Sequence, residues 1–377
     1  MKNVKEEIEI HFDCSEPYPM RPSLAEKLLT PGPVPVPDFV QQAMVRPVIH
    51  HHFPEFSEFY SSLQQRMQYL FQTRGLTFTA PGSGTYGVEM AMYSLFAPGT
   101  RVVVVENGKF SERWVAYGKF RGMDVRAVTV PWGEAAAPGL IAEACQAHQA
   151  KGLVLTHCET STGALTDLEE VALAARELVP EICIVADTIT GVGALPYYHD
   201  DWGIDVAVTS SQKALMSPAG LLLFALSERA IQRMAGAHPA DFAHLGNHIR
   251  AAQNAKSPFT PPVSLMFAVD AALASIQTET LPVVWNRVHA TSRYFKSEII
   301  RLGGQLAAGP ASDSLTAFSF PHLDSDTLRR RLRTEYGLIL SGGQDAWKGK
   351  ILRIAHMGMA AEMSWAREVG ESLRFEV

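Results

Sequence analysis

Six short apolar runs, rich in β-branched residues, constrain the fold of this chain more than any other feature. They cover residues 76–80, 101–106, 152–157, 182–187, 205–210 and 220–226. Helix-like amphipathic stretches separate several of them, as at 85–96, 110–122 and 167–179. Continuous apolar strands that alternate with helices are typical of a mostly parallel sheet covered on both faces. The pattern therefore predicts an α/β fold.

The pattern of predicted helices and strands changes after residue 275. Longer, basic helical stretches alternate there with short strands, at 283–304, 316–320, 325–337 and 351–358. We expect a second, smaller α+β domain from this part of the chain. The predicted division is an N-terminal segment (1–45) that packs on the small domain and on a partner, a large cofactor-binding domain (46–275) and a small C-terminal domain (276–377).

Composition excludes several classes of partner. The 377 residues are 47% hydrophobic and carry a net charge of −6, so no basic surface favours nucleic acid or acidic lipid. The N-terminus lacks the apolar core of a signal peptide, and no apolar run approaches the ~20 residues of a membrane span. The four cysteines, at positions 14, 145, 158 and 183, have no metal-type spacing. These features predict a cytoplasmic protein.

Polar groups or glycine turns follow four of the apolar runs. "LTFTAP" leads into "GSGT", "VLTHCE" into "TSTG", "CIVAD" into "TITG" and "VAVTS" into "SQK". In an open α/β sheet, ligands bind outside the carboxyl ends of the strands. We therefore expect one crevice to collect Ser83, Thr85, Thr160, Asp187, Gln212 and Lys213.

Each of these groups also has a plain structural interpretation. "GSGT" before a helix can hold an anion, but on its own it favours a simple glycine turn. Neither a GxGxxG nor a GxxxxGK[ST] sequence is present, which argues against dinucleotide and Walker-type phosphate binding. Asp187 is also suited to cap a turn, and most lysines lie at the surface. Lys213, however, lies among small residues between apolar flanks, where desolvation lowers the pKa of an amine and makes it nucleophilic. Amine, carboxylate and anion cradle together match the aldehyde, ring nitrogen and phosphate of pyridoxal 5'-phosphate (PLP).

A series of sequence blocks resembles the class V aminotransferases. The blocks cover residues 28–37, 50–56, 70–75, 81–92, 156–165, 185–196, 210–221 and 348–358, in the order typical of that family. The family includes alanine–glyoxylate, serine–pyruvate, serine–glyoxylate and 2-aminoethylphosphonate–pyruvate transaminases. The resemblance extends over nearly the whole chain. It implies the PLP-dependent transferase fold type I, with a mainly parallel seven-stranded sheet in the large domain.

The resemblance also implies roles for individual residues. Lys213 would bind the cofactor covalently and shuttle a proton, and Asp187 would pair with the pyridine nitrogen. The two ring faces would contact Ile189 and Phe110, although an isolated phenylalanine is more often a core residue. The phosphate and ring-hydroxyl contacts would come from Ser83, Gly84, Thr85, Gln212 and Thr160.

Two further residues concern the partner subunit and the substrate. Thr260 resembles the residue that contacts the phosphate of the neighbouring subunit, which implies a homodimer with shared active sites. Arg353 matches the arginine that clamps the substrate carboxylate with two parallel hydrogen bonds.

The chain departs from the family pattern at two places. Ser257 stands where relatives often have a tyrosine, which puts one phosphate contact in doubt. His52 follows His51 where relatives often read His-Arg, which removes a cation near the substrate entrance. Residues adjacent in sequence rarely point at one ion, so we predict no metal at the three histidines 50–52.

The resemblance implies a ping-pong transaminase that moves an amino group from alanine or serine to glyoxylate or pyruvate. Alternatives are a 2-aminoethylphosphonate–pyruvate or aspartate transaminase, or a PLP-dependent lyase of the same fold. A cysteine desulfurase needs a thiol on a mobile C-terminal loop, whereas the last cysteine here, Cys183, falls in a predicted strand. A phosphoserine transaminase would need extra cations to bind the phosphate of its substrate. The presence of Lys213, Asp187 and Arg353 argues against a non-catalytic cofactor-binding protein. The absence of a GxGxxG sequence argues against an NAD-dependent dehydrogenase.

Overall fold

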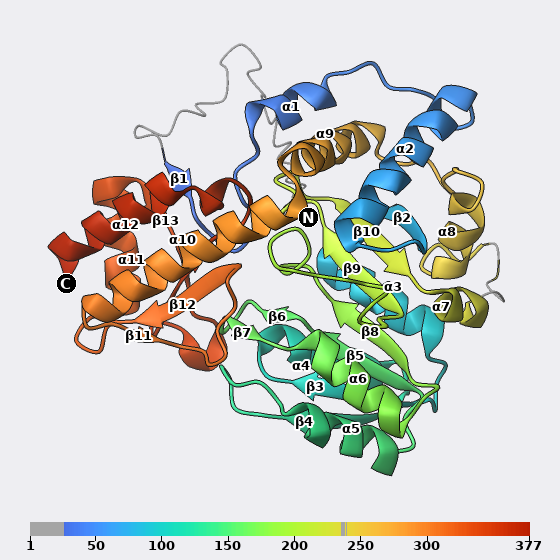
Figure 1. Ribbon diagram of the computed structural model, residues 1–377, viewed down its shortest axis with the longest axis horizontal. Coiled ribbons are helices and arrows are strands. Elements are labelled where there is room, and N and C mark those ends of the chain that lie inside the picture. Colours follow the sequence, from blue (N-terminus) through green and yellow to red (C-terminus); the bar gives the residue numbers. More distant parts are fainter. Residues whose placement is uncertain (1–25, 235–237, 239) are drawn as a thin grey trace, which may run out of the picture.

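A seven-stranded sheet forms the centre of the larger part of the molecule (Figure 1). The computed structural model describes residues 26–234, 238 and 240–377. The strand order is β2 (Leu76–Pro81), β10 (Leu221–Leu226), β9 (Val206–Ser210), β8 (Cys183–Asp187), β5 (Gly152–Thr156), β3 (Arg101–Glu106) and β4 (Asp124–Thr129). Only β10 runs antiparallel to its neighbours. The prediction of a mainly parallel sheet is thus confirmed.

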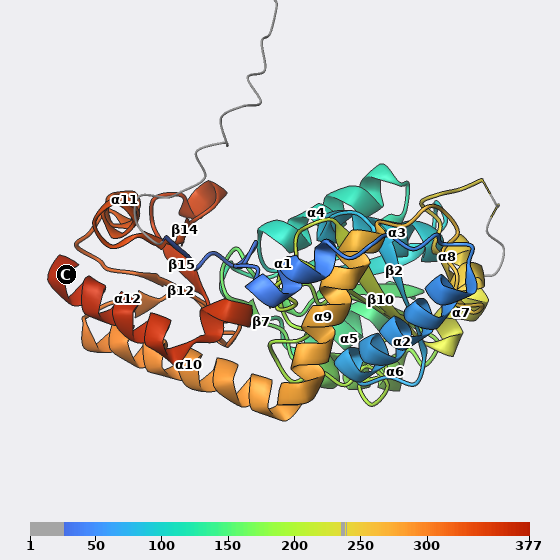
Figure 2. The ribbon, with the colours of Figure 1, turned by 90° about the horizontal axis from the view of Figure 1, so that it is seen from above.

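Helices cover both faces of this sheet. Figures 1 and 2 show α3 (Gly84–Leu95) and α4 (Lys109–Phe120) on one face and α5 (Pro138–Ala147) and α6 (Leu168–Leu178) on the other. The helices predicted at 85–96, 110–122 and 167–179 correspond to α3, α4 and α6. Strand β4 was not predicted, because it lies at the sheet edge and most of its side chains are exposed or half-exposed.

The remaining helices of the larger part are α2 (Pro54–Phe71), α7 (Glu228–Arg233), α8 (Leu245–Ala252) and α9 (Val263–Glu279). Of these, α2 and α8 pack against the β2 end of the sheet. A short antiparallel hairpin, β6 (Cys158–Glu159) and β7 (Ala164–Leu165), follows β5 and carries the predicted Thr160 in its turn.

The smaller part is built on a four-stranded antiparallel sheet. Its strand order is β11 (Gln305–Leu306), β12 (Leu315–Ser319), β15 (Leu352–Ala355) and β14 (Ser341–Gly342). Around it lie α10 (Leu281–Arg301), α11 (Ser325–Tyr336), α12 (Met363–Glu376) and the 3-10 turns η1 (Asp345–Trp347) and η2 (Gly358–Ala361). The two hydrophobic cores meet along α10, where Val284 belongs to the larger core and Val288 to the smaller. The predicted boundary at residues 275 and 276 lies nearby, in the last turns of α9.

The N-terminal segment connects the two parts. Strand β1 (Lys27–Leu28) pairs in parallel with β13 (Leu338–Ile339) of the smaller part. The chain then crosses to α1 (Asp38–Met44), where Val40 packs with Ala268 and Ala272 of α9. Residues 1–25 of the predicted segment lie outside the described residues. In the part of the chain that the structure describes, no helix has the length and apolarity to cross a membrane.

Phe224 lies in the core of the sheet, where we expect a smaller side chain to destabilise the fold. This ring is fully buried on β10, pairs with Phe78 and Val208 on either side, and stacks on the Phe78 ring at a centroid distance of 4.9 Å. Phe224→Ala should lower the free energy of unfolding by about 3–5 kcal/mol, because the void cannot collapse between two paired strands. The equally large Phe120 side chain is 81% exposed, so Phe120→Ala should change it by no more than about 0.5 kcal/mol. Urea denaturation of both variants checks this, and similar losses would contradict it.

Candidate active site

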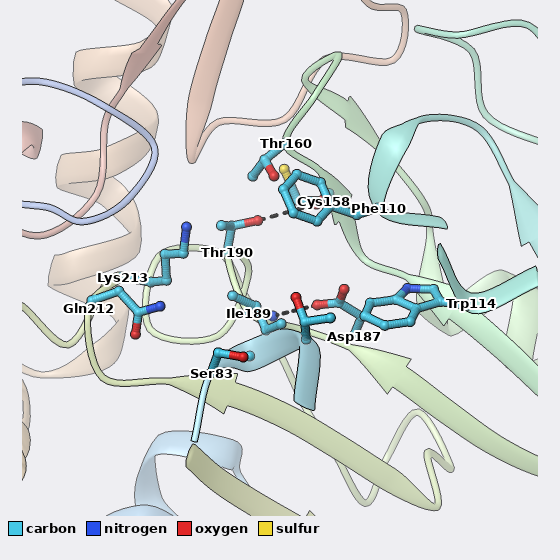
Figure 3. A pocket seen from close by; sticks show the side chains of 12 residues that line it. Ser83, Phe110, Trp114, Cys158, Thr160, Asp187, Ile189, Thr190, Gln212 and Lys213 are labelled. Carbon is cyan, nitrogen blue, oxygen red and sulfur yellow. Dashed lines mark hydrogen bonds between the residues drawn. The ribbon is translucent and has the colours of Figure 1, made fainter. Parts of the chain in front are cut away.

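A cavity of about 130 Å³ opens at the carboxyl ends of the central strands. Nine of the predicted site residues line it: Ser83, Gly84, Thr85, Phe110, Thr160, Asp187, Ile189, Gln212 and Lys213. They come from segments up to 130 positions apart and converge because the parallel strands end at one edge of the sheet. Figure 3 shows Lys213 entering from one side of the cavity and Asp187 on the other.

The N-terminus of α3 forms one wall of the cavity. Ser83 is the N-cap, and its hydroxyl accepts a hydrogen bond from the Tyr86 N–H at 3.4 Å. The N–H groups of the first helical turn have no acceptor within the helix and suit a bound anion. A side chain at Gly84 would lie 2.5 Å from Ile189 Cδ1, so a larger residue there would displace the Ile189 side chain. The lining residue Gln212 has its Oε1 buried without a hydrogen-bond partner among the described residues.

Asp187 supplies a buried carboxyl group at the end of β8. Its Oδ1 accepts a hydrogen bond from the Ile189 N–H at 3.1 Å. Burial raises the pKa of Asp187 to about 7, with a further rise from Glu159 that the Ile189 N–H and Lys213 oppose. A cationic N–H donor facing this carboxyl would therefore stabilise its ionised form.

Lys213 supplies an amine with an unusually low proton affinity. Burial lowers the pKa of Lys213 to about 8, and nearby Arg353 lowers it further, while Asp187 opposes both. Its Nζ donates a hydrogen bond to the Pro31 carbonyl at 2.6 Å, so the N-terminal segment passes directly over the amine. At Gly32, a side chain would lie 2.0 Å from Nζ, and its φ of +125° also favours glycine. At pH 7 roughly a tenth of the amine is uncharged and nucleophilic.

Aromatic and small polar side chains complete the lining. Phe110 and Trp114 project from one face of α4, and Phe110 lies across the cavity from Ile189 (Figure 3). Trp114 Nε1 donates to Thr156 Oγ1 at 3.1 Å, which fixes the indole. The sequence interpretation missed Trp114, Cys158 and Thr190. The i, i+4 spacing of Trp114 from Phe110 was the available signal for the first of them.

Arg353 lies beside the cavity although it does not line it. This arginine is 7% exposed on β15. Its Nε donates to the Gly342 carbonyl at 2.9 Å and its Nη1 to the Thr160 carbonyl at 2.8 Å. Burial lowers the pKa of Arg353 to about 10, a shift that Glu159 opposes, so the guanidinium is charged at neutral pH. The two carbonyls orient the guanidinium, and no hydrogen bond to Nη2 comes from the described residues.

Other predicted positions lie apart from the cavity. Thr260 is exposed and does not line it in a single chain. Ser257 Oγ donates to the Phe259 carbonyl at 2.7 Å, within its own loop. The rings of His50, His51 and His52 lie against one another, with centroids 4.2–5.4 Å apart. No cluster of His, Cys, Asp or Glu in the described ranges has an arrangement that suits a metal ion.

The donor set of the cavity fits PLP. An amine of lowered pKa faces a buried carboxyl group, an aromatic ring faces an aliphatic side chain, and a helix N-terminus offers N–H groups to an anion. The unpartnered Gln212 oxygen also leaves a polar atom for a bound molecule. Of the twelve lining residues, Lys213 is the only cation.

The family model for class-V aminotransferases matches residues 40–364. The chain is 33% identical to the soluble hydrogenase 42 kDa subunit of Anabaena cylindrica over 341 residues, 89% of each chain. It is 30% identical to a serine–glyoxylate aminotransferase of Methylorubrum extorquens, over 89% of this chain and 87% of the relative.

Solved structures of aminotransferases are also similar to this chain. An alanine–glyoxylate aminotransferase of Nostoc sp. superposes with a TM-score of 0.89 at 28% identity, over 98% of this chain and 99% of the other. An aspartate aminotransferase of Thermus thermophilus has a TM-score of 0.87 at 30% identity, over 93% of this chain and all of the other. These similarities confirm the predicted fold and cofactor class.

The lowered pKa of Lys213 predicts how the apoprotein takes up PLP. The amine reacts only when uncharged, so the rate at which the bound cofactor develops its visible absorbance should rise with pH and reach half its maximum near pH 8. Asp187→Asn should move this midpoint to lower pH, because the negative charge of Asp187 raises the pKa of the lysine.

Stopped-flow absorbance over pH 6–11 measures the midpoint, and borohydride reduction followed by peptide mapping identifies the labelled residue. Lys213→Ala is the control and should retain no covalent label. A midpoint near that of an ordinary lysine, or a label on another lysine, would contradict the assignment.

Proposed function

Since the chain belongs to the class-V aminotransferase family, we propose that it transfers the amino group of alanine or serine to glyoxylate or pyruvate by a ping-pong mechanism. The observation that carries the proposal is one cavity with Lys213 and Asp187 on opposite sides and Arg353 at its edge. The protein is a PLP-dependent aminotransferase, and the choice of these small substrates is the proposed part.

PLP, when bound, supplies an electron sink for the negative charge left when the substrate α-carbon loses its proton. Asp187 would hold a proton on the ring nitrogen through its carboxylate. Lys213 in its uncharged form would accept the α-proton on Nζ and donate it back at the cofactor carbon. Phe110 and Ile189 would confine the ring between them and exclude water from its faces.

Arg353 would bind the carboxylate that every donor and acceptor carries. Gly342 and Thr160 already occupy Nε and one N–H of Nη1, so the guanidinium does not need to reorganise when substrate arrives. A buried charge-assisted contact of this kind fixes both the position and the orientation of the substrate.

The scarcity of cations favours a small donor. Lys213 is the only cation among the lining residues, so none of the others offers a charged partner to a second buried substrate carboxylate. Lys109 neighbours the cavity wall, but it already pairs with Asp345 and Glu112. Aspartate is the second candidate donor, since a protein of similar structure carries the name aspartate aminotransferase.

Replacement of Arg353 tests the proposed function. Arg353→Lys should lower kcat/KM for every donor roughly 30-fold or more, because a point charge replaces two parallel hydrogen bonds and such a loss costs about 2–5 kcal/mol. With wild-type enzyme, alanine and serine should outperform aspartate, glutamate and 2-aminoethylphosphonate with either acceptor.

A panel of half-reactions, followed by loss of the cofactor's visible absorbance, measures both effects. Arg301→Lys is the control, because Arg301 is an exposed arginine on the outer end of α10. Faster reaction of aspartate or the phosphonate would replace the small-donor proposal by that alternative.

The proposal includes a homodimer with shared active sites. Thr260 is exposed in one chain, as a residue serving a second subunit must be. The segment from α1 to α2 also exposes large apolar side chains, namely Phe39, Val45, Val48 and Phe53. Apolar surface concentrated on one segment of this kind supports contact with a second copy.

Sedimentation velocity at assay concentration should therefore give a dimer. Thr260→Ala should leave the dimer intact while raising the Kd for PLP about tenfold, since one phosphate hydrogen bond is lost across the interface. An active monomer, or a Thr260→Ala variant with wild-type affinity for PLP, would contradict shared sites.

We also propose a cytoplasmic location. Each described cysteine, at positions 145, 158 and 183, is free and buried. Unpaired thiols in this arrangement suit a reducing compartment. Cell fractionation tests the location.

A further inference from the structure

Glu159 is a fully buried carboxylate beside the cavity that the proposed reaction does not use. Five donor groups surround its two oxygens. The Phe110 N–H donates at 3.1 and 3.3 Å, the Ser111 N–H at 3.0 Å, and the Ser161 N–H and hydroxyl at 3.2 and 2.5 Å. The Ser111 hydroxyl lies 3.1 Å from Oε2, and its one proton is shared among this oxygen, the Gly108 carbonyl at 2.9 Å and Asn107 Oδ1 at 3.3 Å. A buried carboxylate is costly unless its oxygens are hydrogen-bonded, and here both oxygens are.

These contacts make Glu159 the cap of α4. The N-cap residue of that helix is Gly108, which has no side chain to accept the free N–H groups of the first turn. Glu159 accepts two of them from outside the helix, at the end where the helix dipole favours a negative charge. A side chain at Gly108 would lie 2.3 Å from Glu159 Cγ, so glycine is needed there for space.

Phe110 and Thr160, which both adjoin this carboxylate, line the cavity. Phe110 N–H is bonded directly to Glu159, and the Phe110 ring lines the cavity. Thr160 follows Glu159 in the chain, and its carbonyl accepts from Arg353 Nη1. One buried side chain thus ties the helix that carries the aromatic ring to the hairpin that orients the arginine.

We propose that Glu159 is a positioning residue, whose hydrogen bonds to Phe110, Ser111 and Ser161 set the orientation of Phe110 on the cofactor ring and of Arg353 towards the substrate carboxylate. This inference rests on the proposed function, because it uses the proposed contacts of Phe110 and Arg353. Glu159 itself does not line the cavity.

Glu159→Gln is the decisive variant. The amide keeps the shape but places an NH₂ group against N–H and O–H donors, so at least one of the buried hydrogen bonds is lost. The Kd for PLP and the KM for the amino donor should each rise roughly ten- to a hundredfold, as expected for loss of a buried bond to a charged group. At saturating PLP the visible circular dichroism of the bound cofactor should also fall, because the ring is no longer held in one orientation.

Asp205→Asn is the matched control. Asp205 is also a buried carboxylate, bonded to the Ile184 N–H at 2.8 Å, the Ser227 hydroxyl at 2.7 Å and Arg176 at 2.8 Å. It precedes β9, at the end of the strand opposite to Lys213. This variant should lower Tm while the Kd, KM and circular dichroism of the bound cofactor match wild type.

A second variant covers the case in which Glu159→Gln does not fold. Ser161→Ala removes one donor to Glu159 and the acceptor of the Lys109 N–H, and leaves the carboxylate in place. It should therefore shift Kd, KM and circular dichroism in the same direction by a smaller factor. If the folded variants change Tm alone, Glu159 has only a structural role and the inference is overturned. Wild-type protein that fails to bind PLP at Lys213 would instead refute the proposed function itself.

Discussion

The desolvation of the Lys213 amine is the interaction on which the site depends. Burial lowers the pKa of this lysine to about 8, and the same burial raises the pKa of Asp187 to about 7. An ordinary lysine would be almost wholly charged at neutral pH and unable to attack a carbonyl carbon. The strands, the N-terminal segment over Nζ and the helix N-terminus all serve to keep water from this amine while leaving room for a ligand.

The two parts of the molecule meet where the substrate would bind. Arg353 belongs to the small sheet, yet its fork is oriented by a carbonyl of the hairpin after β5. Close by, Lys109 of α4 pairs with Asp345 of η1, and the rings of Trp132 and Trp347 make an edge contact with centroids 5.8 Å apart. The position of Arg353, the proposed carboxylate-binding residue, relative to the cavity is therefore set by contacts between the two parts. Glu159 precedes Thr160, whose carbonyl makes one of these contacts, and is bonded to α4 on the other side.

Sequence patterns predicted most of the fold and most of the cavity. Apolar runs gave six of the seven strands, because a strand buried on both faces must be apolar at every position. Strand β4 was not predicted, because an edge strand is exposed and its pattern of apolar residues is weak. The lining residues Cys158 and Thr190 and the neighbouring Glu159 were not predicted, because nothing in a single sequence shows which side of a hairpin or loop faces a neighbouring helix.

The sequence by itself determined the class of chemistry. An amine, a carboxylate and a glycine turn placed after successive apolar strands must converge, since parallel strands end at one edge. The tertiary structure decided what those groups can do, because proton affinity depends on burial and on neighbours from distant segments. Thr160 and Arg353 are 193 positions apart and meet through one hydrogen bond. Glu159 reaches α4 only because Gly108, 51 positions earlier, leaves space for it. Such contacts are made when separate elements pack, and a linear pattern of residues carries no record of the distance between them.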